Sequence, residues 1–469
     1  MTVTPFIIPI PFRDPVAAFT PLASEEMAVL LDSSLRGHTG RYSYIAVRPF
    51  RTIRCTPYPW AVSVNDKPTG LDPFEALREE IRKYTLDSPP DDSLPPFIGG
   101  AIGFLAYELG GVLEKLPKPK VASFPWDMVV GLYDSIVAFD LRAEKAWVIS
   151  SGLPENQHEK RLERAQERAK TLLELMNGEA ESQQKAPGQS NWHAESTSKD
   201  YEQSVFEIKE AIYSGDIYQA NFSQRFSAEL PKAACPFGIY RSLCSESPAP
   251  FSAYMNFGSD FHILSASPER FLKVTSSGNI ETRPIKGTRR RGVSPEEDIM
   301  LSDELVDSAK DNAENLMIVD LLRNDISRVC IPGSVEVPVL CGLESFPSVH
   351  HLVSVVTGKL RSECTLIDLL RAAFPGGSIT GAPKIRAMEI IHEQERSARG
   401  PYCGTVFWAG FDGAMDSSIT IRTIFVNGRK MIAQAGGGIV AESDPSQEYE
   451  ESLIKVRPLL AALRGTLDT

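Results

Sequence analysis

The chain has 469 residues, and its 49 lysine and arginine residues against 61 aspartate and glutamate residues give a formal net charge of −12 at pH 7. Nucleic-acid backbones are bound by clustered basic side chains, so this acidic balance argues against a nucleic-acid partner. The sequence has no run of about 18 apolar residues that would span a bilayer, and residues 1–11 lack the basic start of a signal peptide. We therefore expect a cytoplasmic protein that makes no membrane contact.

The first third of the chain predicts a mixture of strands and helices. Strands are expected at 42–47 and 129–139, and a helix at 73–83 with Asp72 as its N-cap. Residues 155–176 alternate glutamate with lysine or arginine at three- and four-residue spacing, which is typical of an exposed helix. We expect residues 1–176 to form one N-terminal segment.

A change of composition follows this segment. Residues 177–197 are rich in Ser, Gln, Glu, Ala and Gly and too poor in apolar side chains to offset the entropy of ordering, so we expect a flexible linker. A catalytic domain is expected over 198–469. The elements expected in it are strands at 217–226, 252–257, 261–265, 334–339, 405–411, 418–426 and 430–435, and helices at 200–213 and 303–322. Because the strands come in runs, we expect an α+β fold with large antiparallel sheets in a sandwich flanked by helices.

Two pairs of acidic residues are spaced to share a helix face. Asp311 and Glu314 are three residues apart on one predicted helix, and Glu448 and Glu451 are three apart on another, with Lys455 one turn further along. Carboxylate oxygens suit Mg²⁺, which usually takes one or two protein carboxylates together with substrate oxygens. Taken alone, each pair is better explained by a solvated helix face.

Three further features are candidates for chemistry. Lys286 stands between a proline and a glycine, where a neutral amine could act as a nucleophile; the alternative is a surface lysine beside the basic run 289–291. Arg422, expected inside a strand, has the forked geometry that suits a carboxylate, although an ordinary ion pair explains it equally well. The glycines 436–438, expected after the strand 430–435, would leave bare backbone against a ligand.

Six sequence strings occur in the order found in the chorismate-utilising enzymes, the family of anthranilate, isochorismate and aminodeoxychorismate synthases. They are SPERF at 267–271, PIKGT at 284–288, AENLMIVDLLRND at 313–325, FPGGSITGAPKIRAMEII at 374–391, SITIRT at 418–423 and AGGGIV at 435–440, which the Glu448/Glu451 helix follows. The resemblance covers about residues 200–460, and it is weaker in the first third, where residues 40–43 (GRYS) are similar to the family's N-terminal segment.

One position within the second string divides the family. The anthranilate-forming members resemble P-I-A-G-T there, whereas the members that make 4-amino-4-deoxychorismate have P-I-K-G-T, as this chain does at Lys286. The resemblance implies that Lys286 attacks ring carbon 2 of chorismate and forms a covalent intermediate, and that ammonia then enters at carbon 4. Glu269 would protonate the departing hydroxyl, a task that needs a raised pKa. The expected activity is this amino-group transfer in para-aminobenzoate and folate biosynthesis; the alternatives are an anthranilate synthase and an inactive chorismate-binding relative.

The resemblance also implies the remaining members of the site. Glu314 and Glu451 would bind Mg²⁺ directly, while Asp311 and Glu448 would hold metal-bound waters. Arg422 would contact the enolpyruvyl carboxylate of chorismate. The residues that match positions lining the chorismate pocket are Gly287, Thr288, His351, Ser378, Tyr402, Arg422, Gly436, Gly437, Gly438 and Lys455.

Two further expectations concern regulation and a partner. Some family members in this branch carry a tryptophan pocket, and the residues that match it in part are Ser33, Arg41, Tyr42, Pro250, Phe251 and Ser252. This chain has Asp32 where the feedback-inhibited members have glutamate. No glutamine amidotransferase segment with a G-x-C-x-G turn is found in the sequence. The resemblance therefore implies that a separate glutamine amidotransferase subunit (component II) supplies the ammonia.

Overall fold

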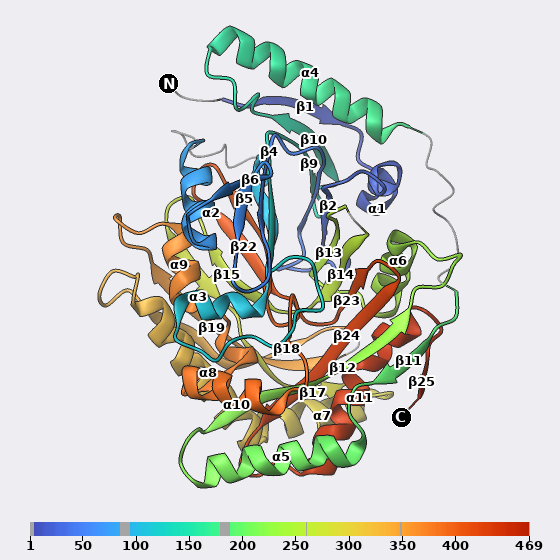
Figure 1. The fold of residues 1–469 in the computed structure, drawn as a ribbon, viewed down its shortest axis with the longest axis vertical. Helices are drawn as coiled ribbons and strands as arrows, with labels where there is room; N and C mark the ends of the chain where they lie inside the picture. Colours follow the sequence, from blue (N-terminus) through green and yellow to red (C-terminus); the bar gives the residue numbers. More distant parts are fainter. Residues whose placement is uncertain (1–3, 85–93, 179–187, 259, 348, 469) are drawn as a thin grey trace.

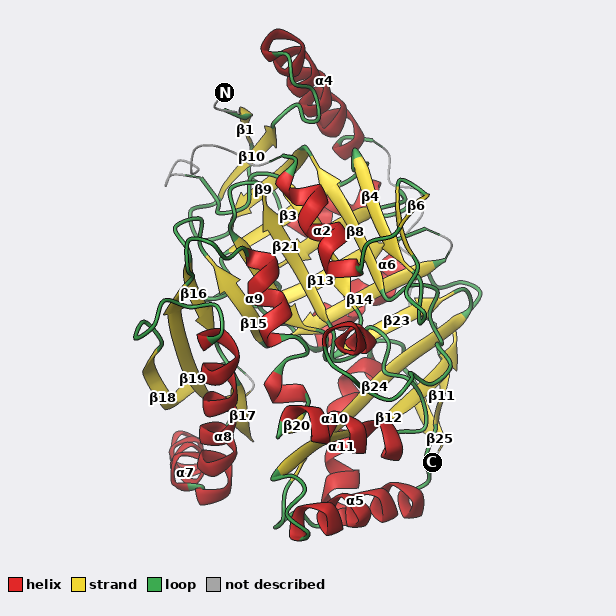
Figure 2. Ribbon diagram, turned by 60° about the vertical axis from the view of Figure 1, so that its left-hand side comes forward, coloured by secondary structure: helices red, strands yellow, loops and turns green. Residues whose placement is uncertain are grey.

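Two large β-sheets form the centre of the molecule, and helices cover their outer faces (Figures 1 and 2). The computed structural model describes residues 4–84, 94–178, 188–258, 260–347 and 349–468. The fold is α+β with mostly antiparallel sheets, as the grouping of strands in the sequence predicts. Among the helices of these ranges, none is long and apolar enough to cross a membrane.

The first sheet contains elements from both ends of the chain. In spatial order its strands are β1 (Phe6–Ile10), β10 (Lys145–Ser150), β9 (Ser135–Asp140), β3 (Tyr42–Ala46), β2 (Ala28–Asp32), β13 (Phe251–Asn256), β14 (Phe261–Ser267), β23 (Thr423–Asn427), β24 (Lys430–Ile439), β12 (Gln219–Glu229), β11 (Asn191–Ala194) and β25 (Thr466–Asp468). A short strand, β20 (Gly381–Ala382), pairs with β12 off this path. β11 and β25 run parallel.

The second sheet carries β17 at one end. Its strands in spatial order are β17 (Ile285–Arg290), β19 (Val349–Lys359), β16 (Asn279–Thr282), β15 (Arg270–Val274), β22 (Met415–Ile419), β21 (Thr405–Gly410), β7 (Gly100–Leu105), β8 (Met128–Tyr133), β4 (Arg51–Cys55), β5 (Val62–Val64) and β6 (Lys67–Thr69), while β18 (Glu336–Ser345) pairs with β19. Pairs β2–β13 and β7–β21 join the N-terminal segment to the rest of the chain by backbone hydrogen bonds. The two segments therefore share both sheets.

The helices connect strands along the chain and lie on the outside of the sheets. They are α1 (Pro15–Phe19), α2 (Pro73–Arg82), α3 (Gly110–Leu113), α4 (His158–Met176), α5 (Ser198–Tyr213), α6 (Pro236–Glu246), α7 (Pro295–Asp307), α8 (Ala309–Ser327), α9 (Leu366–Ala373), α10 (Lys384–Gln394) and α11 (Pro445–Ala461), with short 3₁₀ turns η1 (Thr20–Leu22), η2 (Tyr107–Leu109) and η3 (Gly377–Ile379). The α2 helix begins at Asp72, whose carboxylate accepts the Phe74 and Glu75 N–H groups, as predicted.

Alternation along the strands builds two hydrophobic cores. On β9, Ile136 and Ala138 belong to the core that also contains the inner face of the second sheet, whereas Val137 and Phe139 belong to the core beneath the outer helices. Successive side chains of a strand point to opposite faces, so a strand buried on both faces reads as continuously apolar. Side chains from opposite faces of the same strands therefore fill both the sandwich interior and the layer between the first sheet and its helices.

Three predicted elements are wrong in their boundaries because the chain turns inside them. The strand expected at 129–139 is two strands, β8 and β9, which reverse at Asp134. The helix expected at 303–322 is α7 and α8, and Ser308 between them accepts the Asp311 N–H as the N-cap of α8. The strand expected at 418–426 is β22 and β23, separated at residues 420–422.

The segment 177–197 contains regular structure at its end. Residues 191–194 form β11, which pairs with β12 and β25, and Trp192 is fully buried. One aromatic side chain thus fastens this end of the expected linker to the sheet. Residues 179–187 of that linker lie outside the described residues.

Candidate active site

Lys286 stands on β17 beside an irregularity in the strand pairing. Lys286 is opposite Leu352 of β19, but Thr288 is opposite His351, so the register shifts at Gly287. Gly287 has a φ of +82°, and a Cβ there would lie 2.9 Å from Leu305 Cδ1. Only glycine adopts this conformation readily and leaves room for the helix.

The tip of Lys286 points into the protein. Its Nζ donates a hydrogen bond to the backbone carbonyl of Ser378 at 3.3 Å. A Cβ placed on Gly438 of β24 would lie 3.5 Å from the same nitrogen. The lysine tip therefore lies between η3 and β24, and the reading of Lys286 as an exposed surface lysine is wrong.

Glu269 is buried in the turn between β14 and β15, close to the same serine. Burial raises the pKa of its carboxyl, while a hydrogen bond from the Ser378 hydroxyl and the charge of Lys286 lower it. Ser378 thus contacts both groups, because its carbonyl accepts from Lys286 and its hydroxyl donates to Glu269. The result is an amine and a proton-holding carboxyl in one buried region, which is the arrangement for acid-assisted nucleophilic displacement.

Four carboxylates approach this region from two helices. Asp311 and Glu314 lie on α8, and Glu448 and Glu451 on α11. Burial raises the pKa of Glu314, and the charges of Asp311 and Glu451 add to that effect. Both helices therefore direct acidic groups into one space, whereas the spacing of each pair alone favoured a solvated helix face.

The backbone of β24 makes room for two of these carboxylates. A Cβ on Gly437 would lie 3.1 Å from Glu451 Oε1 and 3.2 Å from Glu448 Oε2. The missing side chain leaves a cradle beside two hard oxygen donors, and this arrangement fits Mg²⁺. Among the described residues no three histidine, cysteine or acidic side chains stand close enough to form a metal cage by themselves. A magnesium ion here would need water or substrate oxygens to complete its shell.

The three glycines have different neighbours inside the strand. They were expected to follow a strand ending at residue 435, but β24 continues to Ile439 and contains them. A Cβ on Gly436 would lie 1.9 Å from the Phe222 carbonyl oxygen, so that glycine permits close pairing with β12. Gly437 faces the carboxylates and Gly438 faces Lys286, so these two shape the site.

Arg422 provides a cation without a protein partner. It lies between β22 and β23 with a φ of +52°, rather than inside a strand as expected. Burial lowers the pKa of its guanidinium. Across the described ranges, Arg422 forms no ion pair and its guanidinium forms no hydrogen bond, so the alternative of an ordinary ion pair is wrong. A half-buried cation in this state is suited to an anionic ligand.

His351 and Thr288 complete one wall. The His351 Nδ1 lies 2.8 Å from Thr288 Oγ1, and burial lowers the pKa of the imidazole to about 4, helped by the charge of Arg422. His351 is therefore neutral at physiological pH. Tyr402 is buried beside this region, and burial raises the pKa of its phenol, which stays protonated.

Sequence reasoning missed Gln219. This first residue of β12 is 1% exposed, and its Nε2 would lie 2.0 Å from a Cβ on Gly438. Its Oε1 is buried without a hydrogen-bond partner in the described structure. A buried amide oxygen left unpaired beside the Lys286 tip is a candidate for ligand contact. Nothing in a glutamine at the start of a strand distinguishes it in the sequence.

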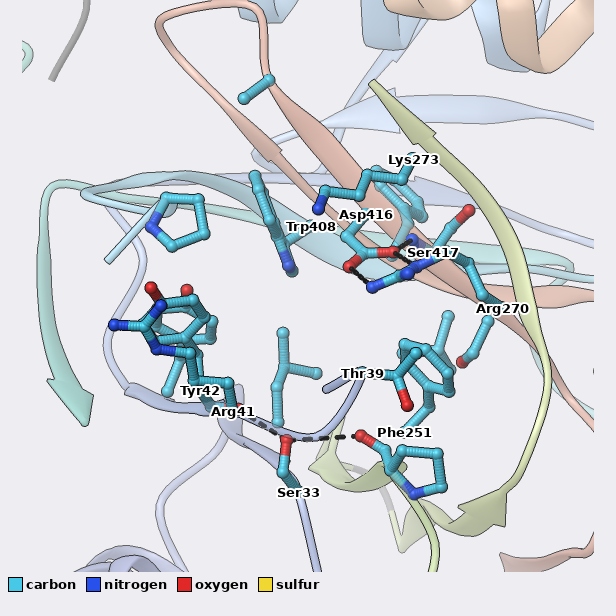
Figure 3. Close-up of a pocket in the computed structure, with 18 of the residues that line it drawn as sticks. Ser33, Thr39, Arg41, Tyr42, Phe251, Arg270, Lys273, Trp408, Asp416 and Ser417 are labelled. Carbon is cyan, nitrogen blue, oxygen red and sulfur yellow. Dashed lines mark hydrogen bonds and ion pairs between the residues drawn. The ribbon is translucent and has the colours of Figure 1, made fainter. Parts of the chain in front are cut away.

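A separate cavity of about 500 Å³ lies between the N-terminal segment and the catalytic part of the chain (Figure 3). The six residues matched to a tryptophan pocket all line it, namely Ser33, Arg41, Tyr42, Pro250, Phe251 and Ser252. The Ser33 hydroxyl donates to the Tyr42 carbonyl at 2.7 Å. Figure 3 shows Trp408 and Lys273 projecting into the space and Arg270 paired with Asp416 at its side. The cavity is thus walled by aromatic rings and by charges of both signs.

Comparison with known proteins shows the family to which the chain belongs. A family model described as chorismate binding enzyme matches residues 35–461. Aminodeoxychorismate synthase component 1 of Klebsiella aerogenes is 39% identical over 98% of this chain and 100% of that protein. Anthranilate synthase component 1 of Thermus thermophilus is 38% identical over 96% of this chain and 95% of that protein.

Two solved structures share the architecture. Anthranilate synthase component I from Streptococcus pneumoniae superposes with a TM-score of 0.80 at 33% identity, covering 91% of this chain and 93% of that chain. The menaquinone-specific isochorismate synthase MenF from Escherichia coli gives a TM-score of 0.72 at 16% identity, covering 98% and 95%. The second likeness concerns the fold alone.

Proposed function

Because the chain belongs to the family of chorismate binding enzymes, we propose that it converts chorismate and ammonia to 4-amino-4-deoxychorismate, as the name of the Klebsiella relative indicates for that protein. The observation that carries the proposal is the Lys286 amine, held at Ser378 beside the buried carboxyl of Glu269. A tethered amine reacts at a large effective molarity, whereas free ammonia is a poor nucleophile toward a ring carbon whose leaving group is a hydroxyl.

In the first half of the proposed reaction, the neutral Lys286 amine forms a bond to ring carbon 2. The two ring double bonds shift, the bond from carbon 4 to oxygen breaks, and the hydroxide leaves as water with the proton of Glu269. In the second half, ammonia bonds to carbon 4, the double bonds shift back, and the lysine amine is released. The proton that ammonia loses goes to the Glu269 carboxylate, which restores the acid.

We assign Mg²⁺ to the carboxylates of α8 and α11, with Glu314 and Glu451 as its direct ligands and Asp311 and Glu448 holding its waters. When bound, the ion would clamp the ring carboxylate of chorismate. The chain's own residues complete substrate binding: Arg422 would take the enolpyruvyl carboxylate. The pocket walls would come from Gly287, Thr288, His351, Ser378, Tyr402, Gly436, Gly437, Gly438 and Lys455.

The relatives' name, component 1, implies a second component. We propose that this partner is a glutamine amidotransferase that supplies ammonia, since the sequence contains no nucleophile turn of such an enzyme. The isolated chain should then use ammonium salts directly. Activity with glutamine should require the partner.

Anthranilate synthesis is the second candidate, because relatives with that name reach 38% identity over 96% of the chain. The two reactions differ in the fate of the enolpyruvyl group, which the proposed reaction retains and anthranilate formation releases as pyruvate. Incubation with chorismate, ammonium and Mg²⁺ should give an aminated product that keeps this group. Stoichiometric pyruvate without added lyase would overturn the proposal in favour of anthranilate synthesis.

Intact-mass analysis distinguishes catalysis from mere binding. With chorismate and Mg²⁺ but no ammonia, the wild-type chain should gain the mass of chorismate less water, and Lys286→Ala should gain nothing. Absence of both adduct and turnover in the wild type would instead support a chorismate-binding relative without activity.

We further propose that the cavity in Figure 3 accepts an amino acid of tryptophan's size and shape. Aromatic walls from Tyr42, Phe251 and Trp408 suit an indole ring, and the charges of Lys273 and Asp32 suit a zwitterion. Calorimetric titration with tryptophan, with alanine as the comparison, tests this; equal weak binding of both would contradict it.

A further inference from the structure

Three basic side chains contact the carboxylates that we assign to Mg²⁺. The ion pairs are Lys455–Glu451 at 2.5 Å, Arg289–Asp311 at 3.3 Å and Lys310–Glu448 at 3.8 Å. The charges of Lys286 and Lys310 also lower the pKa of Glu314, which burial raises. Three of the four carboxylates, namely Glu451, Asp311 and Glu448, therefore each have a paired cation.

Lys310 differs from the other two paired cations in how it is held. Lys455 also donates to the Gly436 carbonyl at 2.9 Å, and Arg289 also pairs with Glu304 at 2.8 Å. Within the described ranges, the Lys310 side chain has its ion pair to Glu448 and forms no hydrogen bond. Its side chain is 47% exposed, whereas the Glu448 side chain is 5% exposed. The exposed lysine side chain can move into solvent at little cost in free energy, whereas the buried Glu448 carboxylate stays within the protein.

We propose that Lys310 is a displaceable counter-ion of the magnesium site. Binding of Mg²⁺ is then an exchange, in which the Lys310 ammonium withdraws to solvent and the metal with its waters takes over the neutralisation of Glu448. The exchange has a physical reason, because a buried carboxylate without any cation is costly. The inference rests on the proposed function, which assigns Mg²⁺ to this cluster.

A consequence follows for the affinity of the metal-free enzyme. Lys310 competes with Mg²⁺ and repels it, so removing this charge should strengthen binding of Mg²⁺ alone. For a half-exposed cation at this range, screening limits the effect, and we expect Mg²⁺ to bind about three- to ten-fold more tightly to Lys310→Met. Lys310→Arg keeps the charge and should leave the affinity within about two-fold of wild type.

Equilibrium titration of the full chain with Mg²⁺ alone tests the exchange. A matched control on the same helix is Arg323→Met, which makes the same change of charge at an exposed pair with Asp320. The expected result is tighter binding in Lys310→Met and wild-type binding in both Lys310→Arg and Arg323→Met. Unchanged or weaker Mg²⁺ binding in Lys310→Met overturns the proposal, as does an equal gain in Arg323→Met.

A second variant separates this proposal from the assignment of the metal itself. Glu451→Gln removes a direct ligand and should weaken Mg²⁺ binding at least ten-fold. If Glu451→Gln leaves the affinity unchanged, Mg²⁺ is not bound at this cluster, and both the assignment and the exchange fail. If Glu451→Gln weakens binding but Lys310→Met does not strengthen it, the exchange alone fails.

Metal-free stability provides an independent readout. Without Lys310, the buried Glu448 carboxylate loses its ion pair, so the melting temperature of Lys310→Met should fall in a metal chelator and recover when Mg²⁺ is added. A loss that Mg²⁺ does not restore would mean that Lys310 has a structural role, and it would overturn the exchange.

Discussion

Lys286 and Ser378 are joined by a hydrogen bond of 3.3 Å, from the side-chain nitrogen of the lysine to the backbone carbonyl of the serine. The hydroxyl of the same serine contacts the Glu269 carboxyl. One residue of η3 thus aligns an amine carried by β17 with an acid carried by the turn before β15. This arrangement makes the acid's pKa depend on the serine.

Replacement of Ser378 by alanine should move the alkaline limb of lysine-adduct formation to higher pH. The Ser378 hydroxyl favours the charged form of Glu269 and so lowers a pKa that burial raises. Without the hydroxyl, the charged form of Glu269 loses a hydrogen bond, so the carboxyl should keep its proton to higher pH. Intact-mass time courses with chorismate over a pH series measure the limb.

The control for that experiment is Ser362→Ala, which removes an exposed hydroxyl that contacts Glu363. Its pH profile should match the wild type. A limb that stays in place or moves to lower pH in Ser378→Ala would show that the serine does not tune the acid.

Replacement of Arg422 by methionine should weaken substrate binding without harming the fold. The guanidinium has no ion-pair partner among the described residues, and burial lowers its pKa, so the folded state gains little from its charge. We expect KM for chorismate to rise at least ten-fold, about 1.4 kcal/mol, with a melting temperature that is unchanged or higher. Steady-state kinetics and thermal denaturation measure the two quantities. A lower melting temperature with an unchanged KM would assign Arg422 a structural role.

The sequence predicts those parts of the structure that local interactions determine. The start of α2 at Asp72 follows from a side chain that accepts hydrogen bonds from residues two and three positions later. The breaks at Asp134 and at Ser308 are different, because apolar or helix-favouring residues continue on both sides of each. At these two positions the tertiary packing of the following strand or helix, rather than the local propensity of the residues, decides where the element ends.

The candidate site depends even more on tertiary structure. The carboxylates of α8 and α11 are more than 130 residues apart in the chain, and the spacing of each pair alone favours an exposed helix face. The resemblance to a family supplied what spacing could not. Neither spacing nor the family resemblance pointed to Gln219. It becomes a candidate only because its amide oxygen is buried without a partner and its side chain lies beside Gly438.

Replacement of Gly437 by alanine should weaken Mg²⁺ binding. The added Cβ would lie 3.1 Å from Glu451 Oε1 and 3.2 Å from Glu448 Oε2, and it would fill the space in front of both oxygens. We expect at least a ten-fold loss of affinity, because Mg²⁺ tolerates little deviation from octahedral geometry. Gly70→Ala is the control, since nothing lies within 4 Å of a Cβ at that position. Equal Mg²⁺ affinity in both variants would place the metal elsewhere.

Replacement of Asp32 by asparagine should stabilise the protein above neutral pH and change little near pH 4. Asp32 lines the cavity between the two segments, and its carboxylate accepts the Ser43 hydroxyl at 2.9 Å. Burial raises its pKa from 3.8 to about 6. The folded state therefore binds this proton more tightly than the unfolded state, and the associated stability is lost as pH rises from about 4 through 6.

The charged aspartate thus costs up to about 3 kcal/mol above pH 7, and asparagine avoids that cost. Thermal denaturation at pH 4.5 and pH 8 should show a higher melting temperature for Asp32→Asn at pH 8 and a much smaller difference at pH 4.5. Asp303→Asn, an exposed position on α7, makes the same change of charge and should show neither effect. A gain of equal size at both pH values would mean that side-chain packing, rather than the buried charge, is responsible.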